Sequence, residues 1–149
     1  MTDPTRAIDA ESARRPLHLR PSAVAIVFVG GTLGTAVREA LSLALPDRGS
    51  VPWTILGINV AGAFALGLLL ESLSLGGPDR GGRRFVRLIA GTGFLGGFTT
   101  YSALAVGMAK LATDGLTGIA VGYGLGTVVA GLVAAAAGVA IARAVRGRR

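Results

Sequence analysis

The stretch GTGFLGGFTT at residues 91–100 decides the fold of this chain. It lies inside an apolar run long enough to cross a bilayer, yet it contains four Gly and three Thr residues. Glycine is flexible and threonine is stiff at χ1, so both weaken the middle of an α-helix. Irregular backbone at membrane depth is tolerated only where it is buried in protein or lines a wet cavity. We therefore interpret this segment as the working part of an ion pathway.

Hydropathy organises the rest of the chain, which has 149 residues, 51% of them hydrophobic, and a mean hydropathy of +0.61. Largely uncharged runs of 18 or more residues predict membrane helices. Four runs qualify: residues 22–45, 53–75, 85–109 and 116–142. We predict an all-α membrane protein with one four-helix domain over residues 22–142. A basic, disordered tail is expected at residues 1–21 and a basic tail at residues 143–149.

Several kinds of chemistry are excluded by composition. The chain has no cysteine, and its one histidine, His18, lies in the polar tail. Thiolate chemistry, a zinc site and a histidine general base are therefore not expected. Nucleotide-binding and zinc-protease signatures are also missing from the sequence, and we do not expect an enzyme.

The net charge of +7 follows the membrane topology. Four crossings place most basic residues on one side, with only Arg48 and Lys110 on the other. The basic groups on the first side are Arg6, Arg14, Arg15, Arg20, Arg80, Arg83, Arg84, Arg87, Arg143, Arg146, Arg148 and Arg149. Positive charge stays cytoplasmic, so we expect a multi-pass protein of the cell inner (plasma) membrane with both termini inside. Anionic membrane lipid, not nucleic acid, explains the charge.

Polar residues inside the first two spans each have two interpretations. Gly30, Gly34 and Arg38 share one helix face, which favours close packing of another helix. Arg38 either reaches a partner or extends to the membrane surface. Asn59, the strongly polar residue inside the second span, either offers N–H donors to an anion or joins two helices by a hydrogen bond. For a membrane Asn the second role is the commoner one.

The third and fourth spans carry the remaining signals. If the third helix breaks near residues 96–100, its second half begins with free N–H groups and its first half ends with free carbonyls, which suit an anion and a small cation. The alternative is an unbroken helix with a small-residue packing face. In the fourth span, Gly118, Gly122 and Gly126 predict a packing stripe, beside a possible polar track of Tyr123, Thr127 and Gly131.

Four pieces of sequence, taken in order, resemble the Fluc/CrcB fluoride channel family. They are GGTLGTAVR (residues 30–38), GINVAGAFALG (57–67), GTGFLGGFTTYS (91–102) and the spacing of Tyr123, Thr127 and Gly131. The resemblance implies four membrane helices, the third broken, in an antiparallel dimer that exports fluoride passively. It also implies a structural sodium ion at the dimer centre, which is not transported.

The resemblance assigns roles to individual residues of this chain. It places the sodium ligands at the backbone carbonyls of Gly96 and Thr99. It places the fluoride pathway at Asn59, Thr100, Tyr101, Ser102, Leu104 and Thr127, with Arg38 matching a family arginine. Amide N–H and hydroxyl O–H groups can replace the water around fluoride, and aromatic ring edges can face an anion.

This chain departs from the family pattern in the run after the break. The family has TTFSTF where this chain has TTYSAL, so Tyr101 and Leu104 replace two Phe residues and Ala103 replaces a hydroxyl. A glutamate common in the family is Gly107 here. The uneven arginine distribution predicts a single orientation. We therefore expect the antiparallel partner to be a second, related subunit, with a homodimer as the alternative.

Two other functions compete with the channel. A proton-coupled small multidrug exporter needs a carboxylate deep in the membrane, but Glu39 and Glu71 lie near helix ends. A non-transporting protein that only packs against other membrane proteins would explain the glycine stripes, but residues 91–100 are more elaborate than that role requires.

Overall fold

The computed structural model describes residues 16–148, all of whose regular elements are helical. The tail predicted at residues 1–21 therefore lies mostly outside the described residues. The elements are η1 (Leu17–Leu19), α2 (Pro21–Ala44), α3 (Trp53–Leu75), α4 (Gly82–Val86), η2 (Arg87–Leu95), α5 (Gly96–Phe98), α6 (Tyr101–Thr113) and α7 (Thr117–Gly147). Helices α2, α3 and α7 are each long and apolar enough to cross a membrane. The remaining crossing runs from α4 to α6 in several pieces, so the prediction of an all-α protein with an interrupted third crossing is confirmed.

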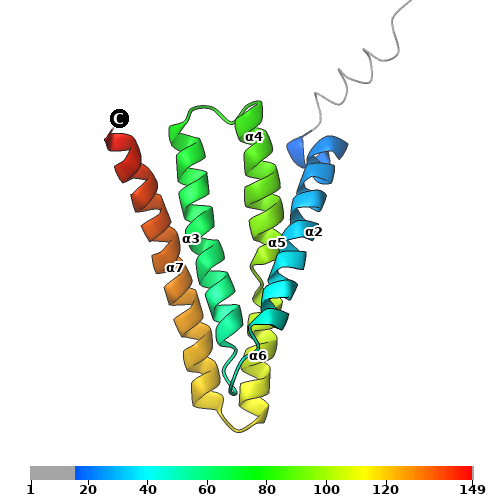
Figure 1. Ribbon diagram of the computed structural model, residues 1–149, viewed down its shortest axis with the longest axis vertical. Helices are drawn as coiled ribbons and strands as arrows, with labels where there is room; N and C mark the ends of the chain where they lie inside the picture. The colour runs from blue at the N-terminus through cyan, green and yellow to red at the C-terminus, as the bar shows by residue number, and fades with distance from the viewer. Residues whose placement is uncertain (1–15, 149) are drawn as a thin grey trace, which may run out of the picture.

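The crossings pack in pairs. Figure 1 shows α2 beside η2 and α5, α3 beside α7, and α6 against the lower part of α7. The start of α2, the loop at residues 76–81 and the end of α7 all lie at one end of the molecule. We call this the basic end, because it carries Arg20, Arg84 and Arg146. The loops at residues 45–52 and 114–116 lie at the opposite, far end (Figure 1).

Glycines allow α2 to lie directly against the third crossing. A Cβ atom added at Gly30 would collide with the carbonyl oxygen of Ile89, and one at Gly34 with that of Phe94. Backbone therefore contacts backbone here, as small-residue membrane interfaces allow. The prediction that Gly30 and Gly34 form a packing face is confirmed.

Helix α7 uses a different set of glycines from the predicted one. A Cβ at Gly118, Gly122 or Gly126 would meet no atom within 4 Å, so within this chain the predicted packing stripe is wrong. Close contacts instead occur at Gly124, against the side chain of Met108, and at Gly138, against backbone of α3. These two glycines and Gly131 are spaced by seven residues, which keeps them close to one side of the helix. The predicted stripe lies on another side of α7.

The turn between α6 and α7 explains why the chain reverses at the far end. Gly115 has φ of 79°, a left-handed conformation that glycine adopts without strain. The N–H of Gly115 donates to Ala112 O, and that of Leu116 to Leu111 O over 2.9 Å. This is the Schellman arrangement that ends many helices. Leu111 is fully buried beneath it, in an apolar cluster with Leu104, Ala120 and Tyr123.

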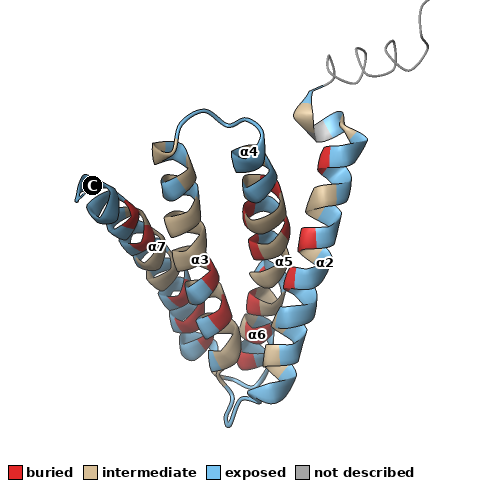
Figure 2. Cartoon of the chain, turned by 45° about the horizontal axis from the view of Figure 1, so that its top comes forward, coloured by how far each residue is buried: buried red, intermediate tan, exposed pale blue. Residues whose placement is uncertain are grey.

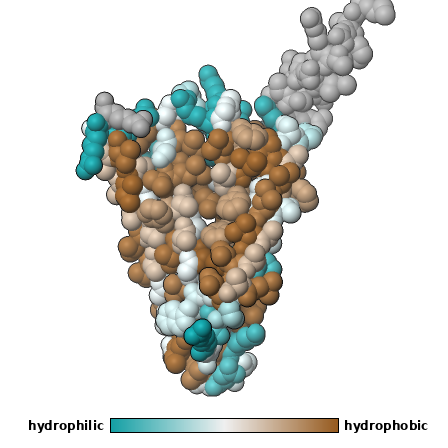
Figure 3. All heavy atoms as spheres, viewed as in Figure 1, coloured by the Kyte–Doolittle hydropathy of each residue, from teal (hydrophilic) through white to brown (hydrophobic). Residues whose placement is uncertain are grey.

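Burial is confined to the lines along which helices meet. Figure 2 shows the buried residues on the sides of the helices that face one another and the exposed residues on the outer sides. Large hydrophobic side chains remain exposed on α2 and α7, among them Phe28, Leu33, Leu125 and Leu132. In Figure 3 a broad hydrophobic band lies below the polar atoms of the basic end. Such a surface suits contact with lipid or with another membrane protein.

Candidate functional site

The third crossing is interrupted at two threonines. Thr99 (φ −79°, ψ 155°) and Thr100 (φ −149°, ψ 123°) are extended, so α5 ends at Phe98 and α6 begins at Tyr101. The nine residues before α5 form the π-helix η2, a wider helix than the α form. The break lies where the Gly and Thr run predicts it. The long π-helical stretch has no counterpart in the prediction.

Asn59 holds the extended segment from the neighbouring helix α3. Its Nδ2 donates to the carbonyl oxygen of Thr100 over 3.0 Å, and the N–H of Thr100 donates to its Oδ1 over 2.8 Å. Because a backbone N–H only donates and a carbonyl only accepts, these partners fix the orientation of the amide. One side chain thus satisfies both polar backbone groups of a residue that is only 7% exposed. The second N–H of the Asn59 amide has no partner among residues 16–148.

The same bonds release two carbonyl groups. In a continuous α-helix the N–H of Thr100 would donate to Gly96 O and the N–H of Ala103 to Thr99 O. Here the Thr100 N–H donates to Asn59 Oδ1, and the Ala103 N–H donates to Thr100 Oγ1 over 3.1 Å. The carbonyls of Gly96 and Thr99 therefore lose their helical donors. These are the two carbonyls that the resemblance assigns to sodium.

Other polar groups complete the two helix ends. Thr100 Oγ1 caps α6 and also lies 3.1 Å from Ser102 Oγ. At the end of the first half, Thr99 Oγ1 donates to Leu95 O over 2.9 Å, and Thr35 Oγ1 of α2 lies 3.4 Å from Gly97 O. The carbonyl of Gly97 thus keeps a donor, although a long one, whereas that of Gly96 does not.

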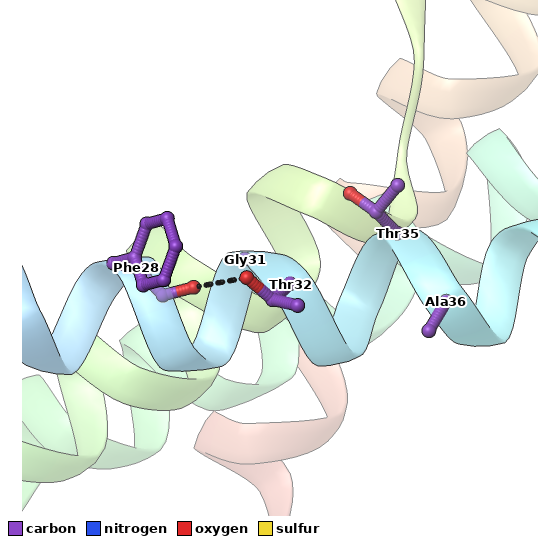
Figure 4. A pocket seen from close by; sticks show the side chains of 5 residues that line it. All are labelled: Phe28, Gly31, Thr32, Thr35 and Ala36. Carbon is purple, nitrogen blue, oxygen red and sulfur yellow. Dashed lines mark hydrogen bonds between the residues drawn. The ribbon is translucent and has the colours of Figure 1, made fainter.

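Thr35 lines an open pocket along α2. The pocket has a volume of about 530 Å³, and its other lining residues are Phe28, Gly31, Thr32 and Ala36 (Figure 4). Thr32 Oγ1 donates to Phe28 O over 2.9 Å within the helix. Sequence reasoning missed Thr35, although its position next to Gly34 on the packing face placed it beside the third crossing.

The structure places the other predicted pathway residues in different surroundings. Tyr101 is 82% exposed at the start of α6, and Ser102 beside it is also exposed. Leu104 is 6% exposed and packs in the cluster with Tyr123, so it does not share the exposed surface of Tyr101. Thr127 is buried and donates to Tyr123 O over 2.7 Å. The residues that direct contacts bring together are Asn59, Thr100 and Ser102.

Arg38 lies half-buried on α2, and its guanidinium makes no hydrogen bond to the Asn59–Thr100 pair. The tyrosine of the predicted polar track, Tyr123, donates from its hydroxyl to Pro52 O over 3.2 Å, next to the start of α3. This contact joins α7 to the far-end loop. Sequence reasoning placed Tyr123 next to Thr127 but gave no signal for its partner on the loop.

The polar groups at the interruption of the third crossing are uncharged. Within residues 16–148 there is no group of three His, Cys, Asp or Glu side chains that could hold a metal. The described carboxylates, Glu39, Asp47, Glu71, Asp79 and Asp114, lie near helix ends or in loops. The polar groups that an ion would meet at the interruption are therefore amides, hydroxyls and carbonyls, without a carboxylate among the described residues.

The amino-acid sequence matches known proteins over most of its length. Residues 25–139 match the family described as CrcB-like protein, Camphor Resistance (CrcB). The chain is 50% identical over 134 residues to the "Fluoride-specific ion channel FluC 2" of Leifsonia xyli, covering 90% of this chain and 92% of that protein. It is 51% identical over 136 residues to the "Fluoride-specific ion channel FluC 1" of Cutibacterium acnes, covering 89% and 94%. The family match covers the second and third crossings fully and most of the first and fourth, and the chain belongs to the CrcB family.

Proposed function

We propose that this chain is a subunit of a fluoride-specific ion channel that lowers cytoplasmic fluoride by passive export. Two relatives at about half identity carry that name over nearly their whole length. The observation within the structure that carries the proposal is the pair of hydrogen bonds between Asn59 and Thr100. They support a stable interruption inside an apolar crossing, where irregular backbone otherwise has no solvent to satisfy it.

The groups around the interruption suit a small, strongly hydrated anion. A pore must replace the water of fluoride with hydrogen-bond donors. The unused N–H of Asn59 and the hydroxyl of Ser102 are neutral donors, which bind an anion without holding it as tightly as a fixed positive charge. Tyr101 adds a ring edge and a hydroxyl on the exposed surface beside them. Thr127, Leu104 and Arg38 would act further along the pathway.

A structural sodium ion at the carbonyls of Gly96 and Thr99 fits the same geometry. Both carbonyls have lost their helical N–H donors, and oxygen atoms are the ligands that hard cations prefer. Gly96 is exposed on this chain, so a second subunit could supply further carbonyls. The positive charge of the bound sodium ion would offset the repulsion between carbonyl oxygens that lie close together.

The proposed assembly is an antiparallel dimer. Tyr101 is 82% exposed at the start of the second half of the third crossing, and in lipid its hydroxyl would lack a partner. A facing subunit at this surface would satisfy it. Among residues 16–148, eight arginines belong to the basic end and two basic residues, Arg48 and Lys110, to the far end, which favours a single orientation. We therefore propose a second, related subunit of opposite charge bias as the partner, with a homodimer as the alternative.

The positions of the charged residues bear on the membrane location and on the alternative function as a proton-coupled exporter. We propose the cell inner membrane, with the basic end in the cytoplasm. A proton-coupled exporter would need an ionisable carboxylate within the membrane. Glu71 instead pairs with Arg143 over 2.8 Å near the basic end, and Glu39 is exposed near the other end of α2. Neither residue lies beside the interruption.

The proposal is tested in liposomes loaded with potassium fluoride. Efflux is followed with a fluoride electrode after addition of a potassium ionophore, and chloride-loaded liposomes measure selectivity. We expect fluoride efflux with the chain and a co-expressed related subunit, and none from empty liposomes. Absence of fluoride efflux from both the chain alone and the pair would remove the proposed function, and robust efflux from the chain alone would remove the need for a second subunit.

A further inference from the structure

A groove separates the first turns of α2 from the third crossing at the basic end. Its larger lobe has a volume of about 650 Å³ and is mainly apolar. A smaller lobe of about 270 Å³ adjoins it and shares Leu17, Ala23 and Leu88 with it. We call the two lobes together the α2/η2 groove. The larger lobe extends along α2 from Ala23 to Phe28, a rise of about 7 Å into the apolar band.

Arginine side chains surround the upper part of the groove. Arg87 lines the larger lobe, and Arg20 and Arg84 line the smaller one. Arg87 donates from Nε and Nη2 to the two carboxylate oxygens of Asp79 over 3.0 and 2.7 Å. Arg84 donates to the backbone oxygen of Asp79 over 3.1 and 2.7 Å. Asp79 therefore holds two guanidinium groups in place beside the groove.

Positive charge exceeds negative charge at this site. The hydrogen bond from Arg87 holds the pKa of the Asp79 carboxyl below its usual value, so Asp79 is ionised at neutral pH. Its single negative charge faces the two guanidinium groups of Arg84 and Arg87, which leaves one positive charge in excess. Each guanidinium has five N–H donors, so Arg87 keeps three after its bonds to Asp79.

We propose that the α2/η2 groove binds one anionic phospholipid. Its headgroup phosphate lies against Arg84 and Arg87, and the upper part of one acyl chain lies in the apolar lobe beside Val24, Val27 and Phe28. The depth of the groove matches this orientation, because the charged groups lie at the basic end and the apolar walls lie below them. A soluble anion would use only the charged part and leave the apolar lobe unfilled.

The test compares lipid retention by native mass spectrometry of the purified full-length protein. The probes are dioleoyl phosphatidylglycerol and dioleoyl phosphatidylcholine, which share their acyl chains and differ in net charge. We expect phosphatidylglycerol to be retained preferentially. Arg87→Gln should lower its affinity about fivefold, because one basic residue near a membrane surface contributes about 1 kcal/mol of lipid attraction. Arg146→Gln, on α7 at the same end, is the matched control and should leave retention unchanged.

A second pair of variants tests the apolar lobe without touching charge. Val24 lines the groove and is 55% exposed, so Val24→Trp fills the lobe with little strain on the fold. Val29 is similarly exposed on α2 outside the groove and provides the control Val29→Trp. We expect only Val24→Trp to reduce phosphatidylglycerol retention.

Three results would overturn the proposal. The first is equal retention of the two lipids. The second is an unchanged affinity in both Arg87→Gln and Val24→Trp. The third is a Val24→Trp variant that no longer forms the dimer but retains lipid as the wild type does. This result would mean that a partner subunit occupies the groove.

Discussion

Asn59 and Thr100 form a two-bond pair in which the side-chain oxygen of Asn59 takes the place of the helical acceptor of the Thr100 N–H. Nδ2 of Asn59 donates to Thr100 O and Oδ1 accepts from Thr100 N, over 3.0 and 2.8 Å. The pair both supports the interruption and frees the Gly96 carbonyl that Thr100 N would otherwise approach. Sequence reasoning offered Asn59 two roles, anion donor or link between helices, and the structure shows that the link ends on the broken backbone itself.

Asn59→Ala should reduce fluoride flux without preventing insertion or assembly. The change removes both hydrogen bonds that hold the backbone of a nearly buried residue in its extended conformation. We expect a flux loss of about tenfold or more, because each lost hydrogen bond is worth roughly 1 kcal/mol. Fluoride efflux from liposomes gives the flux, and size-exclusion chromatography checks assembly.

Ser42→Ala provides the control for this variant, because Ser42 Oγ donates only to Arg38 O within α2. Its flux should equal that of the wild type. Equal flux in Asn59→Ala and Ser42→Ala would show that the pair has no part in transport.

Sodium should stabilise the wild-type assembly more than it stabilises Asn59→Ala. Without Asn59, the N–H of Thr100 is free to return to Gly96 O, which competes with the ion for that carbonyl. At a sodium concentration 100 times the dissociation constant, binding adds about 2.7 kcal/mol to stability. Thermal unfolding in sodium chloride and in N-methylglucamine chloride measures the effect, through the fluorescence of the single tryptophan, Trp53. The same sodium-dependent shift in both proteins would contradict the link between Asn59 and the carbonyl site.

Two adjacent glycines, Gly96 and Gly97, allow contacts within the chain to be tested apart from contacts with a partner subunit. A Cβ at Gly97 would collide with Gly31 O of α2, whereas a Cβ at Gly96 would meet no atom of the chain within 4 Å. Gly97→Ala should therefore lower the stability of the protein by about 1–3 kcal/mol, as overpacking does. Gly96→Ala should leave the fold of the chain intact and weaken only dimerisation or the sodium response.

Thermal unfolding and the oligomeric state of the two variants decide this point. If Gly96→Ala keeps full dimerisation and the full sodium response, Gly96 does not face the partner. If Gly97→Ala is as stable as the wild type, the close contact between α2 and α5 is not required.

The sequence predicted the interruption because Gly and Thr weaken a helix wherever they cluster, which is a local property. Local properties did not reveal the π-helix η2, nor the close backbone contacts that it makes with Gly30 and Gly34 of α2, which lie far away in the sequence. They also did not show which glycines of α7 pack within this chain. Gly118, Gly122 and Gly126 have the expected spacing, but only the positions of α3 and α6 decide which face of α7 is covered. The pairing of Asn59 with Thr100 is hidden for the same reason, because the two residues lie 41 positions apart.

Tyr101→Ala should impair the assembled channel but not the fold of the chain. Its side chain is 82% exposed, so its removal leaves the packing of this chain unchanged. We expect less dimer and lower fluoride flux, with the helical circular dichroism of the wild type. Tyr101→Phe, which keeps the ring, should retain dimerisation. Wild-type flux and dimerisation in Tyr101→Ala would show that the exposed surface at the break faces lipid.

The orientation of the chain can be measured directly, because it contains no cysteine. Ser50→Cys places a thiol in the far-end loop and Pro78→Cys places one in the loop at the basic end, where both positions are exposed. If the basic end stays in the cytoplasm, a membrane-impermeant maleimide added to intact cells should label only Ser50→Cys. Permeabilised cells provide the control, in which both variants should be labelled. Equal labelling of both variants in intact cells would mean that the chain inserts both ways, and a homodimer would then replace the pair of related subunits.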